Sequence, residues 1–413
     1  MLGRLTAHRR LALIFWMTTG CGGAAFETGG DAGPNGATEA LGMEAAVEAS
    51  VCAPLPAKAT DVYVDQAFTG TPRTGAPACP LLTIAEGIAV AVSLGGSSTV
   101  HVAGAVPALV YKETGPPTIV AGVTLQGEGA SQVTIDASGT CTTTTCAVIV
   151  EGGGVLDGFT VTSAAGDGVE TSASSPAPVV RNVNATGSMG NGIMALGALE
   201  LGPNVSASGN GNGGLQSPVT ASGVVHVVGT ANSFDNNAGN GINFDGTATL
   251  NFEGGSANGN AQGLRLGGAA TGAHTVTSLT ATGNTGPGGF VAYNGQTIKL
   301  RSSVLMANAG VGLLYNAANG STLDLGTGPA AMGGNTFGGV TATGRNAKGG
   351  LRLCSTAAVV VQPAYGNDWS SCPPTQTAVA CGATIGSYSD VVYGVGAAMA
   401  VAPVVATACA LGP

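Results

Sequence analysis

A repeat of about 24 residues constrains the fold of this chain more than any other feature. Through the middle of the sequence, a glycine followed by an apolar residue recurs after a polar Gly/Asn turn, at Val169, Ile193, Leu215, Ile242, Leu264, Phe290 and Leu313, and again at Leu351. The first six steps are 24, 22, 27, 22, 26 and 23 residues long. β-Sandwich turns recur about every 8–12 residues without a longer period, and propeller blades repeat at about 40 residues. The repeat therefore predicts a solenoid whose coils each hold three short strands, joined by turns that tolerate insertions.

Composition agrees with short strands and tight turns, and it excludes several classes of protein. Of 413 residues, 70 are Gly, 44% are hydrophobic and 8% are charged. A disordered chain would need lower hydrophobicity and more charge, and collagen would need a Gly-X-Y period. The net charge of −9, with no Lys/Arg cluster after residue 10, argues against a nucleic-acid partner.

The residues before the repeat predict a strand and a short helix. Residues 61–65 alternate polar and apolar side chains, which is typical of a strand. Thr83 and Glu86 form the Thr-x-x-Glu pattern of a capping box, and Ile84, Ile88 and Val92 give the following helix one apolar stripe. Strands are then expected at 99–102, 123–125 and 133–135.

This order resembles the N-terminal region of bacterial right-handed parallel β-helix proteins of the pectate-lyase-like superfamily. The matching parts are the first strand, a loop with Pro-x-x-Thr-Ile, the helix, Thr-Val-x-Val and a Gly-rich turn. The resemblance implies an all-β, single-stranded right-handed parallel β-helix with coils of about 22–27 residues and a short N-terminal capping helix. It divides the folded part into a cap with first coils (52–140), further coils (141–353) and a cystine-tied closure (354–413).

The resemblance also implies a ladder of stacked asparagines in one turn of the coils. The candidates lie between the repeat markers, at Asn210, Asn237, Asn258, Asn284 and Asn308. Asn tolerates the left-handed conformation, and its amide can bond the equivalent amide one coil away, about 4.8 Å along the axis.

The first twenty residues are typical of an export signal. Arg4, Arg9 and Arg10 precede a short apolar run from residue 11 to 17, and the segment 18–21 ends at Cys21 and resembles a bacterial lipobox. We expect cleavage before Cys21, which would then carry lipid; ordinary secretion and an uncleaved anchor are the alternatives. Residues 21–51 have acidic but no basic side chains, as in a flexible tether. The expected partner is a lipid bilayer of the bacterial cell envelope, facing the periplasm or the cell surface.

The cysteine count agrees with export. Nine cysteines leave eight once Cys21 is assigned to lipid, which permits four disulfides in an oxidising compartment. Eight cysteines allow 105 connectivities, and we favour the sequence neighbours Cys52–Cys79, Cys141–Cys146, Cys354–Cys372 and Cys381–Cys409. No C-x-x-C motif is present and no His lies near a cysteine in the mature sequence, so we expect no metal site.

Motifs for catalysis and cofactors are weak. Pectin-degrading members of the superfamily use several ionised groups that converge on one groove, whereas the coils here contain few. The nearest carboxylates are Asp157 and Asp167, with Glu170 and Arg181 nearby; their Asp-Gly pairs are typical of turns. A G-x-G-x-x-G string at residues 209–214 lies in a coil turn without a following helix, so we expect no nucleotide or other cofactor and assign no catalytic residue.

One outward face and the aromatic residues are candidates for glycan binding. Alignment of the coils by their Asn turns predicts one outward column, with Thr277 and Arg301 beside it, formed by Glu200, His226, Thr249, Thr275, Lys299 and Asp324. Lys299 and Asp324 would form a stabilising pair across coils; alternatively, His226, Lys299 and Arg301 line a groove for an anionic polysaccharide. The aromatic residues divide into two groups. Phe244, Tyr293 and Tyr315, with Leu266, are expected to form an interior stack, and Tyr365 and Trp369 are the candidates for a sugar platform.

These patterns favour a non-catalytic cell-envelope lipoprotein whose rigid β-helix acts in adhesion or glycan binding. A polysaccharide lyase or glycoside hydrolase acting on an acidic polysaccharide is the alternative, and only the superfamily resemblance supports it.

Overall fold

The computed structural model describes residues 52–394 with internal gaps, and the statements below concern these residues alone. The gaps fall at 96, 138–146, 163–164, 269–271, 295, 318–320, 328–329, 340–342, 356–359, 362–363, 365, 370–374 and 380–388. The expected signal peptide, Cys21 and the acidic tether lie outside this part of the chain, as do residues 395–413.

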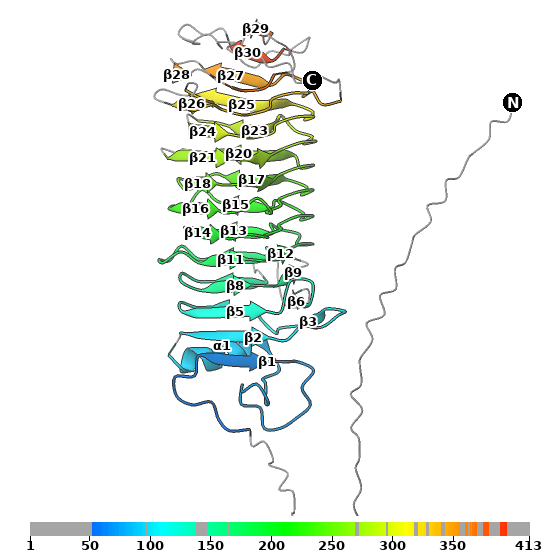
Figure 1. Cartoon of the computed structure of the whole chain (residues 1–413), viewed down its shortest axis with the longest axis vertical. Coiled ribbons are helices and arrows are strands. Elements are labelled where there is room, and N and C mark those ends of the chain that lie inside the picture. The colour runs from blue at the N-terminus through cyan, green and yellow to red at the C-terminus, as the bar shows by residue number, and fades with distance from the viewer. Residues whose placement is uncertain are drawn as a thin grey trace, which may run out of the picture. The chain divides into compact units, whose positions relative to one another are not determined.

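The coils stack into two long parallel sheets that face each other (Figure 1). Sheet 1 has 12 strands, in the order β1 (Asp61–Val64), β2 (Ser98–Val102), β5 (Val123–Gly127), β8 (Val155–Asp157), β11 (Val179–Arg181), β14 (Leu199–Leu201), β16 (Val224–Val227), β18 (Thr249–Phe252), β21 (Ala273–Thr277), β24 (Thr297–Arg301), β26 (Thr322–Asp324) and β28 (Val360–Val361). Sheet 2 also has 12, in the order β4 (Thr118–Ile119), β7 (Val148–Val150), β10 (Val169–Thr171), β13 (Ile193–Ala195), β15 (Leu215–Ser217), β17 (Asn240–Phe244), β20 (Gln262–Leu266), β23 (Gly288–Ala292), β25 (Val311–Ala317), β27 (Leu351–Ser355), β30 (Val391–Gly394) and β29 (Gln376–Val379).

A narrower third side completes each coil. It consists of β3 (Leu109–Tyr111), β6 (Val133–Asp136), β9 (Thr160–Thr162) and β12 (Asn184–Ala185), and of the pair β19 (Gly255–Ser256) and β22 (Leu279–Thr280). Single bridges such as Asn184–Ser206 and Ser206–Ser233 continue this side between the short strands. The predicted all-β parallel β-helix is therefore present, and every strand pair named within the described residues is parallel.

The repeat read from the sequence is the hydrogen-bond register of sheet 2. Each predicted apolar marker pairs with the next, from Val169 with Ile193 through to Leu313 with Leu351. All of these side chains are buried, because alternate residues of a strand face the solenoid interior.

The interior aromatic stack differs from the prediction at one position. Phe244 lies in register with Leu266, Leu266 with Ala292, and Ala292 with Tyr315. Tyr293, which we expected in this stack, is the residue after the inward-facing Ala292 and is only half-buried. The expectation was wrong because a shift of one residue moves a side chain to the opposite face of a strand.

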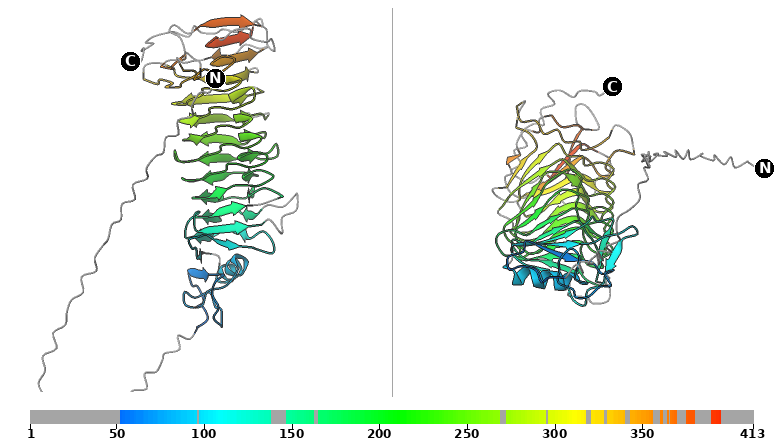
Figure 2. Two further views of the ribbon diagram at one scale, coloured as in Figure 1. Left: turned by 90° about the vertical axis from the view of Figure 1, so that its right-hand side faces the viewer. Right: turned by 60° about the horizontal axis from the view of Figure 1, so that its bottom comes forward.

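Helix α1 (Ile84–Ser93) covers the N-terminal end of the coils (Figure 2). The predicted capping box is present, since the Thr83 side chain accepts from the Glu86 N–H and the Glu86 side chain accepts from the Thr83 N–H. The predicted stripe is partly wrong, because Ala91 is buried whereas Val92 is 46% exposed. Gly87 allows the close approach, as a Cβ there would lie 2.6 Å from Val64. In the described residues, no helix has the length and apolarity needed to span a bilayer.

The asparagine ladder runs through one turn of the coils, with one member different from the prediction. In its central part, the Asn237 side chain donates to Asn260 (3.2 Å), and the Asn284 side chain donates to Asn308 (2.9 Å). The buried members are Asn210, Asn237, Asn260, Asn284, Asn308 and Asn346. Asn258 is not a member; it lies two residues earlier and accepts from Thr282 at the surface of the turn.

A buried histidine links coils inside the solenoid. His274 is 1% exposed; its Nδ1 accepts from the Leu250 N–H (3.1 Å), and its Nε2 lies 2.9 Å from Gln296 Oε1. The first contact leaves Nδ1 without a proton, so Nε2–H donates to Gln296 and the ring is neutral. Burial lowers the pKa of His274 in agreement with that assignment.

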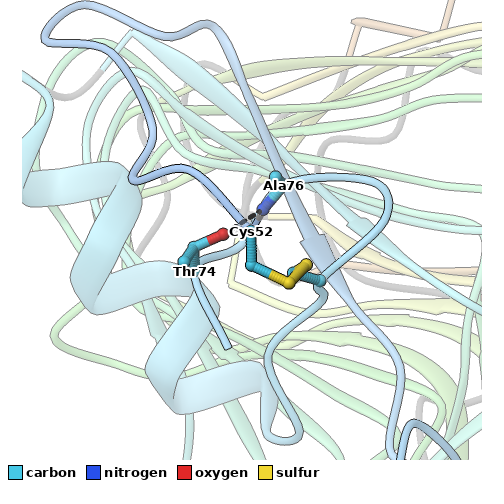
Figure 3. The surroundings of a disulfide bond; sticks show 4 residues. Cys52, Thr74 and Ala76 are labelled. Atoms are coloured by element: carbon cyan, nitrogen blue, oxygen red, sulfur yellow. Dashed lines mark hydrogen bonds between the residues drawn. A yellow bond between two sulfur atoms is a disulfide. The ribbon is translucent and has the colours of Figure 1, made fainter. Parts of the chain in front are cut away.

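One predicted disulfide lies beside the cap (Figure 3). Cys52 and Cys79 are bonded, and the Cys79 carbonyl accepts from the N–H groups of Thr74 and Gly75. Cys354 is disulfide-bonded as well. The other cysteines of the predicted pairs lie outside the described residues: Cys141, Cys146, Cys372, Cys381 and Cys409.

Candidate functional site

The predicted outward column of sheet 1 is present with one substitution. Register joins Glu200 to His226, Thr275 to Lys299, and Lys299 to Asp324. Between them, the position equivalent to His226 and Thr275 is Asn251. Thr249, the residue we expected there, instead pairs with Val224, one alternation earlier on the same face.

Two of the three basic side chains predicted to hold an anionic glycan are paired with carboxylates. His226 Nε2 lies 3.0 Å from Glu253 Oε1, and Arg301 Nη2 lies 2.6 Å from Asp324 Oδ2. Asp324 therefore pairs with Arg301 and not, as expected, with Lys299. Lys299 is exposed, and no ion pair joins it to another described residue. An anion arriving at this face would have to compete with Asp324 and Glu253.

Trp369, one of the two residues of the predicted aromatic platform, does not share that face. Trp369 lies on the third side of the coil, where its neighbour Asp368 bridges Thr336. Its ring stacks on the buried Phe337, with centroids 4.7 Å apart, and the side chain is half-buried against the core. Tyr365 lies outside the described residues.

The carboxylates singled out from the sequence hold neighbouring coils together. Asp157 is 7% exposed and accepts from Arg181 Nε (2.9 Å) and Asn182 Nδ2 (2.7 Å). Asp167 accepts from the backbone and side chain of Asn191. Burial, with a smaller contribution from Asp167, raises the pKa of Glu170 on the outer face of sheet 2.

A polar cluster that the sequence analysis missed lies on the outer face of sheet 2, on β15, β17 and β20 and on the residues that directly follow β17 and β23. We call it the Asp245 cluster; its members are Gln216, Asn243, Asp245, Arg265 and Tyr293. Gln216 pairs with Asn243 and Asn243 with Arg265, so three outward positions stand in one column. Asn243 Nδ2 donates to Gln216 Oε1 (2.7 Å), and Arg265 Nη1 donates to Asn243 Oδ1 (2.8 Å).

Asp245 and Tyr293 complete the cluster on either side of Arg265. Asp245 accepts from Arg265 through Oδ1, and from Asn243 (2.7 Å) and Gln216 (3.5 Å) through Oδ2. The Arg265 guanidinium carbon lies 5.8 Å from the centre of the Tyr293 ring, within range of a cation–π contact. The Tyr293 N–H donates to the Leu266 carbonyl, which fixes the aromatic residue one coil beyond the arginine.

The cluster presents amide, guanidinium, carboxylate and aromatic groups side by side. It is accessible, since the Arg265 and Asp245 side chains are 28% and 25% exposed. Side chains of this kind hydrogen-bond hydroxyl groups and stack against flat apolar surfaces. A signal was present in the sequence, because Gln216, Asn243 and Arg265 each follow directly after a predicted inward marker and so face outward.

In the part of the chain that the structure describes, no group of three or more His, Cys, Asp or Glu side chains is arranged to hold a metal ion.

Comparisons with known proteins gave one structural match. No family model and no curated protein matches the sequence. Among solved structures, the chain is similar to the A-module of the mannuronan C-5 epimerase AlgE6 of Azotobacter vinelandii. The match has 15% sequence identity and a TM-score of 0.41, and it covers 75% of this chain and 94% of that one.

Proposed function

We propose that this protein is a non-catalytic β-helical rod of the bacterial cell envelope that binds glycan through the outer face of sheet 2. The observation that supports binding is the Asp245 cluster, in which hydrogen-bonding side chains from successive coils meet the accessible ring of Tyr293. Parallel coils are spaced by about 4.8 Å, so the cluster offers its groups at regular intervals along the rod. That geometry suits an extended polymer better than a compact metabolite.

Saturation of the one carboxylate in the cluster argues for binding without catalysis. Asp245 accepts hydrogen bonds from Arg265, Asn243 and Gln216. Both oxygens of this carboxylate already accept from an arginine or an amide, which leaves it little capacity to engage a substrate hydroxyl as a general base. Glycoside hydrolysis normally requires two carboxyl groups across the scissile bond, and the cluster contains one.

Binding can be tested on immobilised neutral and acidic polysaccharides with matched variants of the two faces. Tyr293→Ala removes the ring, and Lys299→Ala is the control because it removes an exposed cation from sheet 1. We expect Tyr293→Ala to weaken binding about 2- to 12-fold, the equivalent of one aromatic contact, and Lys299→Ala to leave it unchanged. Weaker binding by Lys299→Ala with unchanged binding by Tyr293→Ala would place the glycan on sheet 1. Unchanged binding by both variants would contradict glycan binding at either face.

A product assay separates the proposal from the enzyme alternative. The same polysaccharides are incubated with the protein and assayed for reducing ends and for unsaturated uronic acid. We expect neither product. Release that Arg265→Gln abolishes would make the Asp245 cluster an active site and overturn the non-catalytic part of the proposal.

Attachment to the envelope through Cys21 is a separate part of the proposal, supported by the lipobox-like segment and the acidic tether that follows it. Radioactive palmitate should label the wild-type chain in bacteria and should fail to label Cys21→Ser. Label retained in the variant would refute acylation at this position.

A further inference from the structure

A pocket of about 390 Å³ lies at the N-terminal end of sheet 1, away from the Asp245 cluster. Its floor is a column of outward residues in register, in which Tyr63 pairs with His101 and His101 with Gln126. Two carboxylates stand one alternation beyond that column, Asp65 after β1 and Glu128 after β5. Its volume falls within the range of small-molecule sites, about 300–1,000 Å³.

The wall of the pocket that faces this floor is held in place before any ligand binds. Pro77 and Pro80 line it, and they flank Cys79, which the disulfide ties to Cys52 (Figure 3). The same segment bonds to β1 through its backbone, since the Leu81 N–H donates to the Tyr63 carbonyl (2.9 Å). A wall fixed in this way reduces the entropy lost when a ligand binds.

The floor is also fixed by side-chain contacts. The rings of Tyr63 and His101 stack with centroids 4.9 Å apart and an interplanar angle of 21°. His101 Nε2 lies 2.7 Å from Asp61 Oδ1, and this hydrogen bond, followed by that from Thr60, lowers the pKa of Asp61. The histidine is therefore oriented by a carboxylate and an aromatic ring, both from the neighbouring strand β1.

The charge of the lining selects the ligand class. Asp65 and Glu128 are acidic, and no Lys or Arg belongs to the residues described as lining the pocket. Each carboxylate keeps capacity for a further donor, because among the described residues Asp65 Oδ1 accepts from the Ala67 N–H and Glu128 Oε2 from the Gly104 N–H, which fills one acceptor site of each. A ligand with ammonium and hydroxyl donors on a ring that fits against Tyr63 would satisfy both.

We propose that this pocket binds an amino sugar through its protonated amine. The ammonium group bonds Glu128 or Asp65, and the sugar ring lies against the Tyr63–His101 floor between Pro77 and Pro80. This site is independent of the glycan face on sheet 2, so either can fail without the other.

Calorimetric titration of the purified full chain with D-glucosamine, against N-acetyl-D-glucosamine, tests the proposal. Acetylation removes the positive charge and keeps the sugar ring. One charge-assisted hydrogen bond corresponds to about a tenfold or larger difference in affinity, so glucosamine should bind at least that much more tightly. Equal affinities, or no saturable binding of glucosamine, would overturn the proposal.

Two variants and a control locate the site. Glu128→Gln keeps an oxygen acceptor for the Gly104 N–H but loses the charge, and it should weaken glucosamine binding about tenfold. Gln126→Glu adds a carboxylate to the floor and should tighten glucosamine binding. Misfolding cannot produce such a gain in affinity. Glu151→Gln, an exposed acid that does not line the pocket, should change nothing. Wild-type affinity in both pocket variants would refute this location.

Discussion

Replacing Asn284 with alanine should remove one rung of the asparagine ladder from a site that water does not reach. Asn284 is 1% exposed, and its Oδ1 accepts from the Asn260 backbone N–H (2.9 Å). Its Nδ2 donates to Asn308 Oδ1 (2.9 Å). The Asn284→Ala variant therefore loses one accepted and one donated hydrogen bond between coils.

The cost follows from which groups are left without partners. The buried Asn260 N–H loses its acceptor, which costs about 1–3 kcal/mol. Asn308 Oδ1 still accepts from the Asn284 backbone N–H (3.0 Å), so the loss there is about the net worth of one hydrogen bond, ~1 kcal/mol. Together the variant should be less stable by about 2–4 kcal/mol, a large part of the ~5–15 kcal/mol that holds a domain folded.

Hydrogen exchange is the decisive assay, because a solenoid can open locally while distant coils remain folded. The Asn260 amide should exchange about 30-fold faster or more in Asn284→Ala, the rate change that 2 kcal/mol produces. Urea unfolding followed by circular dichroism should show a lower midpoint in the same variant.

Asn212 supplies the matched control, since it lies in a turn of the same series, is exposed, and makes no side-chain hydrogen bond to a described residue. Asn212→Ala should change stability by less than about 0.5 kcal/mol. If Asn284→Ala behaved in the same way, and the Asn260 amide kept its protection, the ladder would not contribute the stability that its geometry implies.

Three further results should follow from the fold. Cys52→Ser should destabilise the cap by about 3.5 kcal/mol, because the bond to Cys79 closes a loop of 27 residues, and adding Cys79→Ser should cost little more in urea unfolding. Phe252→Ala should cost about 3–5 kcal/mol in the same assay, since the ring is fully buried. Burial lowers the pKa of His274 below its ordinary 6.5. The stability that neutral His274 contributes is therefore complete above pH 6.5 and is lost as the pH falls toward the lower pKa of the folded state. Over that pH window, the urea midpoint of the wild type should drop more than the midpoint of His274→Gln.

The fold could be predicted because its period is written directly in the chain. Strand pairing in sheet 2 joins residues such as Phe290 and Leu313, and the sequence spacing of 23 is the register itself. The same spacing already placed Ala292 opposite Tyr315. The pair of Tyr-Asn dipeptides 22 residues apart suggested Tyr293 instead, and that weaker coincidence led to the wrong face.

Errors of two residues have a different physical origin. Thr249 was expected where Asn251 lies, and Asn258 where Asn260 lies. Within a strand, a shift of two keeps a side chain on the same face, so alternation cannot detect it. Only the length of the preceding turn decides the register, and turn lengths vary between coils because insertions there leave the stacked strands undisturbed.

The missed cluster shows why function was harder to predict than fold. Asn243 and Arg265 are in register on neighbouring coils, and Asp245 lies two residues after Asn243 on the same face. Asp245 and Arg265 are therefore only 20 residues apart in the sequence, less than one coil. Such diagonal contacts depend on side-chain direction between coils, which no linear period records.

Low charge, which first favoured a scaffold over an enzyme, has a more specific meaning once the ion pairs are located. In the described residues, Arg181, Arg265 and Arg301 each pair with a carboxylate 20 to 24 residues away, that is, on a neighbouring coil. These three arginines therefore join adjacent turns of the solenoid. Asp65 and Glu128 line a pocket whose lining contains no lysine or arginine. Two carboxylates in the lining of a preformed pocket that contains no lysine or arginine are the strongest reason to look for a ligand at that end.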